Sequence, residues 1–140
     1  MINTKIIAVD FDGTIVEDAY PKIGKPRMFA FETLKRLEEK GYRLTLWTYR
    51  HGESLQEAVE FCRKNGIEFY AVNNSFEGES YDIQTQSRKI NADIFIDDRN
   101  VGGFPGWGEI YEIIIKKKTL DFDKAQRKEK KKKKFLGLFG

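Results

Sequence analysis

Two aspartates near the start of the chain have a spacing that suits metal-dependent phosphate chemistry. Asp10 and Asp12 open the run Asp10-Phe11-Asp12-Gly13-Thr14, in which Gly13 permits backbone angles that other residues avoid. Two carboxylates this close repel each other unless a cation or a shared proton lies between them. Oxygen ligands of this kind favour Mg²⁺. The alternative interpretation is an Asp-Gly turn with two solvated acids.

A second carboxylate pair, Asp97-Asp98, directly follows the apolar run Ile94-Phe95-Ile96. Taken alone, this pair suits the cap of a helix or turn that follows a strand. Two carboxylate pairs that end two strands of one parallel sheet converge on the same crevice, and an acidic cluster there requires a metal ion. We therefore predict that Asp10, Asp12, Asp97 and Asp98 surround Mg²⁺.

Three other residues have side chains that suit a phosphate group. Thr48 ends an apolar run and is followed closely by Arg50, so a hydroxyl and a planar guanidinium fork lie near each other in the sequence. Lys89 would balance the acids and hold a phosphate. The alternatives are β-propensity for Thr48 and solvent-exposed side chains for Arg50 and Lys89.

The order of these residues along the chain resembles that of the motifs in the haloacid dehalogenase (HAD) superfamily of phosphotransferases. The likeness runs from about Lys5 to Ile115. Lys89 lies closer to Asp97 than in many members, a spacing that resembles small capless members. Arg88 and Arg50 are the alternative cations. The four motifs of the superfamily match, in order, Asp10–Thr14, Thr48, Lys89 and Asp97-Asp98.

The resemblance implies a Mg²⁺-dependent phosphomonoester hydrolase that works through an aspartyl-phosphate. Asp10 would attack phosphorus, and Asp12 would protonate the leaving oxygen and later activate water. The metal would be held by Asp10, the Asp12 backbone carbonyl and the last motif, with Asp98 as the direct ligand and Asp97 acting through water or by orientation. Which of these two binds directly stays open. Thr48 and Lys89 would neutralise the phosphoryl oxygens.

Hydrophobic patterning predicts the elements that position these residues. Alternating strands and helices imply an α/β fold with a doubly wound parallel sheet, helices on both faces in three layers, and ligands at the carboxyl ends of the strands. A short helix is also expected near Tyr81–Ser87. The expected strands are Lys5–Asp10, Leu44–Trp47, Ile67–Val72 and Asp93–Asp97, and the expected helices are Pro26–Lys40, one capped by Ser54 and Glu57 and ended by Asn65-Gly66, and one from Trp107.

Segment lengths leave no room for a cap domain. Only 33 residues separate Thr14 from Thr48, and 40 separate Thr48 from Lys89. We expect one HAD-like domain over residues 1–118 with an open site, unless the loop Asn73–Asp82 or a second subunit in a homo-oligomer covers it. Its substrate would be a phosphorylated small molecule or a phosphorylated macromolecule.

The charge of the chain is unevenly distributed. Residues 1–115 hold 14 Lys and Arg against 19 Asp and Glu, whereas residues 116–140 hold 11 against 3. We expect residues 119–140 to form a basic, disordered tail. The alternative is that its lysine block contacts an anionic membrane surface or nucleic acid.

Two other functions remain open for the same fold. A receiver-like phospho-switch uses similar residues, but its acidic pair comes on the first strand and its lysine comes last. A non-catalytic phosphate-binding module is the other alternative. One histidine, His51, and one cysteine, Cys62, give little support to a histidine-based triad or a zinc hydrolase. The composition, with no apolar run near the ~20 residues of a membrane span, predicts a cytoplasmic protein.

Overall fold

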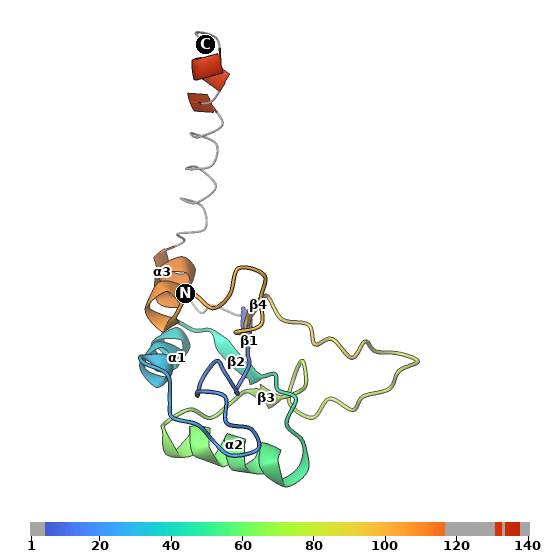
Figure 1. The fold of residues 1–140 in the computed structure, drawn as a ribbon. Coiled ribbons are helices and arrows are strands. Elements are labelled where there is room, and N and C mark those ends of the chain that lie inside the picture. Colours follow the sequence, from blue (N-terminus) through green and yellow to red (C-terminus); the bar gives the residue numbers. More distant parts are fainter. Residues whose placement is uncertain (1–4, 117–130, 133, 138–140) are drawn as a thin grey trace. The chain divides into compact units, whose positions relative to one another are not determined.

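The computed structural model describes residues 5–116, 131–132 and 134–137 of the chain (Figure 1). It contains two compact units, Met1–Trp107 and Gly108–Gly140. The first unit is built on four parallel strands in the order β3-β2-β1-β4. The strands are β1 (Ile6–Val9), β2 (Arg43–Leu46), β3 (Ala71–Val72) and β4 (Ile94–Ile96).

The centre of this sheet is almost completely closed to solvent. Ile7 on β1 lies opposite Leu44 on β2 and Ile94 on β4, and Val9 lies opposite Leu46. Ile7, Val9, Leu44 and Leu46 are each at most 1% exposed. A strand that is covered on both faces has a continuous run of apolar residues in the sequence, and such runs predicted these strands. The all-parallel α/β fold without a cap domain is therefore confirmed.

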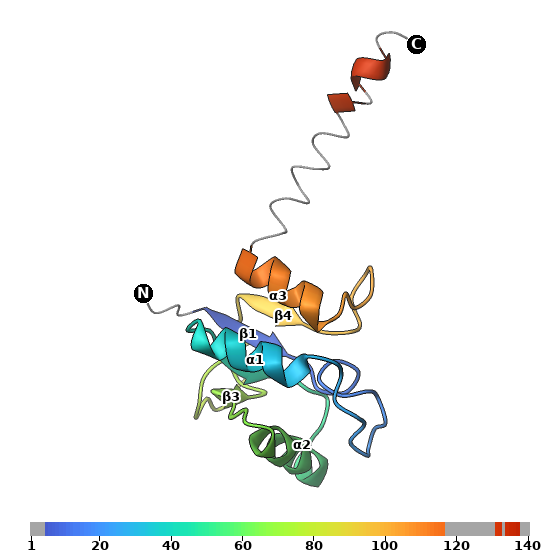
Figure 2. The ribbon, with the colours of Figure 1, turned by 90° about the vertical axis from the view of Figure 1, so that its left-hand side faces the viewer.

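Two helices of the first unit, α1 (Ala30–Glu39) and α2 (Gly52–Lys64), present apolar faces to its core. Leu34 and Leu37 on α1 and Cys62 on α2 are fully buried. The two helices meet where the rings of Phe31 and Phe61 lie 6.0 Å apart between centroids. Figure 2 shows α1 crossing in front of the sheet.

Both helices begin at residues other than those predicted. Pro26 does not open α1, because it forms a bridge with Val16 and the helix starts four residues later at Ala30. His51, rather than Ser54, is the residue before α2, and the Ser54 hydroxyl donates back to the His51 carbonyl at 2.9 Å.

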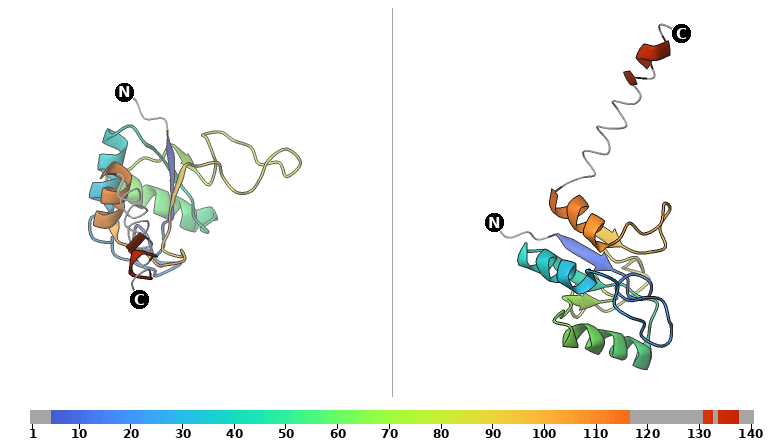
Figure 3. Two further views of the ribbon diagram at one scale, coloured as in Figure 1. Left: turned by 90° about the horizontal axis from the view of Figure 1, so that it is seen from above. Right: turned by 60° about the vertical axis from the view of Figure 1, so that its left-hand side comes forward.

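The segment between β3 and β4 does not form the helix expected near Tyr81–Ser87. A single turn forms there, closed by backbone N–H groups of Thr85 and Gln86 that donate to the Asp82 carbonyl. The Asp82 carboxylate accepts from the Gln84 N–H at 3.0 Å, a local side-chain bond that competes with helix propagation. Seen from above, α1 lies on one side of the sheet and this segment extends away from the other (Figure 3, left).

The helix predicted from Trp107 is present as α3 (Trp107–Lys116). In the basic segment 119–140, residues 131–132 and 134–137 are helical. The other residues of that segment lie outside the described part of the chain, so its disorder stays a prediction. Among the described residues, no helix has the length and apolarity that a membrane span requires.

Candidate active site

Asp10, from the first carboxylate pair, meets Asp97 and Asp98 at the carboxyl ends of β1 and β4, whereas the Asp12 carboxylate, also predicted beside the metal, is not in this cluster. These strands are neighbours in the sheet, and the Asp10 N–H donates to the Ile96 carbonyl at 2.9 Å. One carboxylate oxygen each from Asp10, Asp97 and Asp98 lies within 4.8 Å of the other two. The predicted convergence of these three acids is confirmed, and together they are able to hold a metal ion.

Thr14 ties the two halves of this acidic cluster together. Its hydroxyl lies 2.9 Å from Asp10 Oδ2 and 3.2 Å from Asp98 Oδ1, and it accepts the Asp98 N–H at 2.9 Å. The side chain is fully buried, and its backbone carbonyl accepts a 2.7 Å bond from Trp107 Nε1. Thr14 lies in the predicted motif, but its bridging role was not predicted, since it depends on which acids the fold places beside it.

Glycine is the only residue type that fits at position 13, next to Asp98. Its φ of +86° is a left-handed conformation, which favours glycine. A Cβ atom here would lie 2.3 Å from Asp98 Oδ2 and 2.7 Å from Asp98 Cγ. The turn after β1 therefore needs a glycine both for its backbone angle and for the space that Asp98 occupies.

The pKa of the Asp10 carboxyl group is raised to about 7. Burial of its carboxyl group is the largest cause, and the neighbouring charges of Asp97 and Asp98 add to it, whereas the Thr14 hydrogen bond lowers the pKa. Among the described residues, no ion pair joins Asp10, Asp97 or Asp98 to a basic side chain. A bound cation would supply the missing positive charge.

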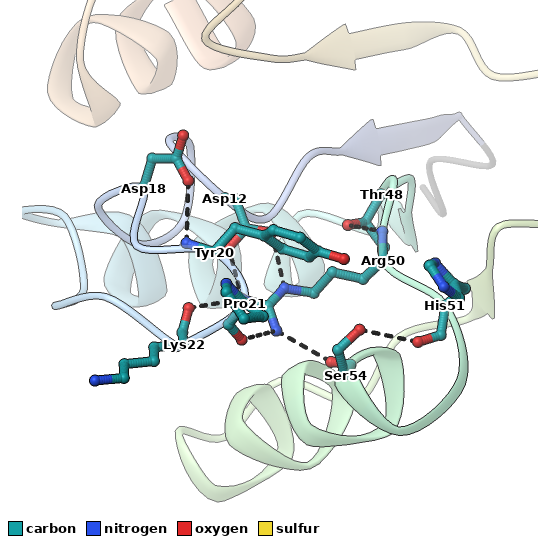
Figure 4. Close-up of polar contacts among 9 residues, drawn as sticks. All are labelled: Asp12, Asp18, Tyr20, Pro21, Lys22, Thr48, Arg50, His51 and Ser54. Carbon is teal, nitrogen blue, oxygen red and sulfur yellow. Dashed lines mark hydrogen bonds and ion pairs between the residues drawn. The ribbon is translucent and has the colours of Figure 1, made fainter.

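Asp12 differs from the other three acids because a buried arginine holds it. Arg50 Nη2 lies 2.7 Å from Asp12 Oδ1, and Arg50 Nε lies 2.8 Å from Asp12 Oδ2 (Figure 4). Arg50 is 1% exposed. Arg50 was predicted to bind phosphate, but the structure directs its guanidinium to Asp12. Sequence spacing gave no signal for this pairing, because the two residues lie 38 positions apart.

A cavity of about 740 Å³ is lined in part by Asp10, Asp12 and Asp97. Thr48 lines it, as predicted, and is fixed by an N–H bond of 2.8 Å to Asn73 Oδ1. The Thr48 hydroxyl oxygen accepts the Arg50 N–H at 3.1 Å, which leaves the hydroxyl proton free to donate. The lining consists of Asp10, Asp12, Asp18, Tyr20, Trp47, Thr48, Tyr49, Asp97 and Arg99.

The predicted third motif lies outside this cavity. Lys89 is exposed, and its Nζ lies 5.3 Å from the centroid of the Phe95 ring, whereas Arg88 stacks on Tyr81 at 5.2 Å. The structure thus does not bring Lys89 or Arg88 to the acids. Arg99 is the one basic residue among the described residues that line the cavity. It was not singled out from the sequence, although it directly follows the second acidic pair.

The single histidine and the single cysteine lie outside the cavity lining. His51 is exposed at the start of α2. Cys62 is fully buried, and burial raises the pKa of its thiol to about 12, which keeps it protonated and unreactive. Cys62 therefore belongs to the core.

One comparison with solved structures finds a close relative of the whole fold. The chain is similar to a conserved protein of Bacteroides thetaiotaomicron, with 57% sequence identity and a TM-score of 0.79. The match covers 85% of this chain and 96% of that one. No protein-family model matches the sequence, and no curated protein is significantly similar to it.

Proposed function

We propose that this chain, which belongs to the same family as the conserved Bacteroides thetaiotaomicron protein, is a Mg²⁺-dependent phosphomonoester hydrolase of the HAD superfamily. The observation that carries this proposal is the cluster of Asp10, Asp97 and Asp98, with their carboxylate oxygens within 4.8 Å of one another beside an open cavity. The likeness of three motifs to that superfamily, Asp10–Thr14, Thr48 and Asp97-Asp98, supports the same activity, whereas the match at Lys89 lies outside the cavity.

The donor set fits a magnesium ion. Three carboxylates without a basic partner among the described residues match the all-oxygen ligands that Mg²⁺ prefers. Asp10, Asp98 and the Asp12 backbone carbonyl would hold the ion, and Asp97 would orient its water. When bound, Mg²⁺ withdraws charge from the phosphoryl group and shields the nucleophile from the phosphate dianion.

In the first step, a carboxylate oxygen of Asp10 attacks the phosphorus of a phosphate monoester. The bond from phosphorus to the ester oxygen breaks, and its electron pair stays on that oxygen. The Asp12 carboxyl group transfers a proton to this leaving oxygen, so that an alcohol departs. Thr48 donates its free hydroxyl proton to a phosphoryl oxygen, and Arg99 offers the positive charge that was expected from Lys89.

In the second step, water hydrolyses the aspartyl-phosphate. The Asp12 carboxylate takes a proton from water while the water oxygen bonds to phosphorus. The bond between phosphorus and Asp10 breaks, which returns the Asp10 carboxylate and releases inorganic phosphate. The proton that Asp12 takes from water replaces the one given to the leaving oxygen, and the net reaction is ester plus water to alcohol plus phosphate.

The experiment is an assay of purified protein with 4-nitrophenyl phosphate and a panel of phosphorylated metabolites. We expect hydrolysis that EDTA abolishes and added Mg²⁺ restores. Asp10→Asn should remove turnover while leaving the fold intact, because an amide of nearly the same shape is a poor nucleophile. Asp93→Asn is the matched control, since Asp93 lies at the opposite end of β4 and accepts the Ile6 N–H.

Two results would overturn the proposal. Turnover that survives chelation would contradict the metal assignment, and near-normal turnover in Asp10→Asn would contradict the nucleophile. A phosphorylated Asp10 that forms but never hydrolyses would favour the receiver-like alternative. Binding of phosphate esters without any turnover would favour the non-catalytic module.

A further inference from the structure

Arg50 makes more contacts than a side chain in a solvated surface loop would need. It follows β2 closely, yet its side chain is buried in full. Its guanidinium donates to three backbone carbonyls in addition to Asp12: Pro21 at 3.1 Å, Lys22 at 2.8 Å and Ser54 at 3.2 Å. Figure 4 shows these bonds reaching it from two different segments of the chain.

Two aromatic rings complete the enclosure of this guanidinium. Its central carbon lies 5.0 Å from the centroid of the Phe11 ring and 5.2 Å from that of Tyr20. The hydrogen bond to Asp12 is the first cause of the raised Arg50 pKa, so the side chain stays charged. A planar group fixed by carbonyls at its edge and rings on its faces has one orientation, and whatever it binds is oriented as well.

The group that Arg50 orients is the Asp12 carboxyl group, and part of its hydrogen-bonding capacity stays available for proton transfer. The fork takes one lone pair on each carboxylate oxygen, and a carboxylate has about four such sites. The Asp12 side chain is 16% exposed and lines the cavity, so its remaining lone pairs are accessible from the site. Arg50 itself does not line the cavity, which argues against direct contact with the substrate.

We propose that Arg50 is a positioning residue that fixes the plane of the Asp12 carboxyl group for proton transfer to the leaving oxygen. This inference rests on the proposed hydrolase activity. Proton transfer needs the two heavy atoms within hydrogen-bond reach, and small misplacements of a catalytic group reduce rates steeply. Arg50 therefore acts through Asp12, while Thr48 and Arg99 contact the phosphoryl group.

The test compares two aryl phosphates whose leaving groups need different amounts of help. The 4-nitrophenolate ion leaves readily without a proton, whereas phenolate is about as basic as a tyrosine side chain, with a pKa of about 10. Arg50→Lys keeps the charge but loses the fork. Because hydrolysis of the aspartyl-phosphate is common to both esters, the readout is kcat/KM, which reports the step that expels the leaving group. We expect kcat/KM for phenyl phosphate to fall by roughly 10²-fold or more and kcat/KM for 4-nitrophenyl phosphate to fall less than about tenfold.

The Asp12→Asn background supplies a second, independent readout. If Arg50 acts through Asp12, then Arg50→Lys should add little further loss to Asp12→Asn with phenyl phosphate. Arg63→Lys is the matched control, because Arg63 forms an exposed ion pair with Glu60 on α2 and should change neither substrate. Arg50→Gln, whose neutral amide still offers N–H donors to the Asp12 carboxyl group, replaces Arg50→Lys if the latter does not fold.

Three outcomes would overturn the inference. Equal losses of kcat/KM on both substrates would show a merely structural role, as would unfolding of both Arg50 variants by circular dichroism. A raised KM with unchanged kcat would show that Arg50 binds the phosphate. Failure of the wild-type protein to hydrolyse either ester would refute the hydrolase activity itself, and the role of Arg50 with it.

Discussion

Gly13→Ala should damage the metal site through a single added methyl group. The new Cβ would lie 2.3 Å from Asp98 Oδ2, whereas ordinary contact begins near 3.4 Å. The three atoms nearest to this Cβ all belong to the Asp98 carboxylate, so this group must retreat, by about 1 Å on these distances. Asp98 would then move away from Asp10 and from the Thr14 hydroxyl that now bonds to it.

The expected losses follow from two separate physical effects. A left-handed backbone angle costs a residue with a Cβ about 1–2 kcal/mol of folding free energy. Displacing one carboxylate of the cluster should weaken Mg²⁺ binding by roughly 10–100-fold, the range that disturbed metal surroundings produce. Turnover should fall by about 10²-fold, as a misplacement of 1 Å can cause.

Gly78→Ala separates these two effects. Gly78 has a φ of +82°, close to that of Gly13, but a Cβ there meets no atom within 4 Å. Both variants should lose stability in urea denaturation through the backbone angle, and Gly13→Ala should lose more because it also displaces Asp98 from the Thr14 hydroxyl. Only Gly13→Ala should lose Mg²⁺ affinity by isothermal titration calorimetry and turnover with 4-nitrophenyl phosphate. Equal Mg²⁺ affinity in the two variants would refute the placement of Asp98 in the metal site.

Three further predictions concern Thr14, pH and the tail. Thr14→Val should lower the free energy of unfolding, measured in urea, by about 1–3 kcal/mol and should also reduce Mg²⁺ affinity, because it removes the buried hydroxyl between Asp10 and Asp98. Thr14→Ser should retain both the stability and the affinity, and an unaffected Thr14→Val would contradict the bridge. The Asp10 carboxyl has a folded pKa of about 7 against an ordinary 3.8, so its contribution to stability without metal is greatest below pH 4 and is lost as pH rises through 7. Mg²⁺ needs the carboxylate, so it should raise Tm more at pH 8 than at pH 5.5 by scanning calorimetry, and an equal rise would contradict the assignment. Truncation after Leu120 should leave turnover on small phosphates unchanged and abolish any salt-sensitive binding to anionic vesicles; lost turnover would make the tail part of the site.

The acidic cluster could be predicted because it depends on local signals. Asp10 and Asp97 each follow a short apolar run that ends at the same edge of a parallel sheet. Neighbouring parallel strands bring such residues together whatever the details of the loops. The sheet itself was predictable for the same reason, since buried strands read as apolar runs.

The environment of Arg50 could not be predicted, because it depends on distant backbone. Its partners Pro21 and Ser54 reach it from a loop before α1 and from α2, and no spacing in the sequence encodes that meeting. The segment before β4 was mispredicted for a local reason. Asp82 and Gln86 satisfy one turn with their own side chains, so no helix follows.

Formation of a beryllofluoride adduct on Asp10 tests the proposed mechanism most directly. Beryllofluoride bound to a carboxylate mimics the aspartyl-phosphate, and ¹⁹F NMR detects it without any knowledge of the natural substrate. The mechanism predicts an adduct that needs Mg²⁺, forms on the wild-type protein and on Asp12→Asn, and is absent from Asp10→Asn. An adduct on Asp10→Asn, or none on the wild-type protein with Mg²⁺ present, would contradict Asp10 as the nucleophile.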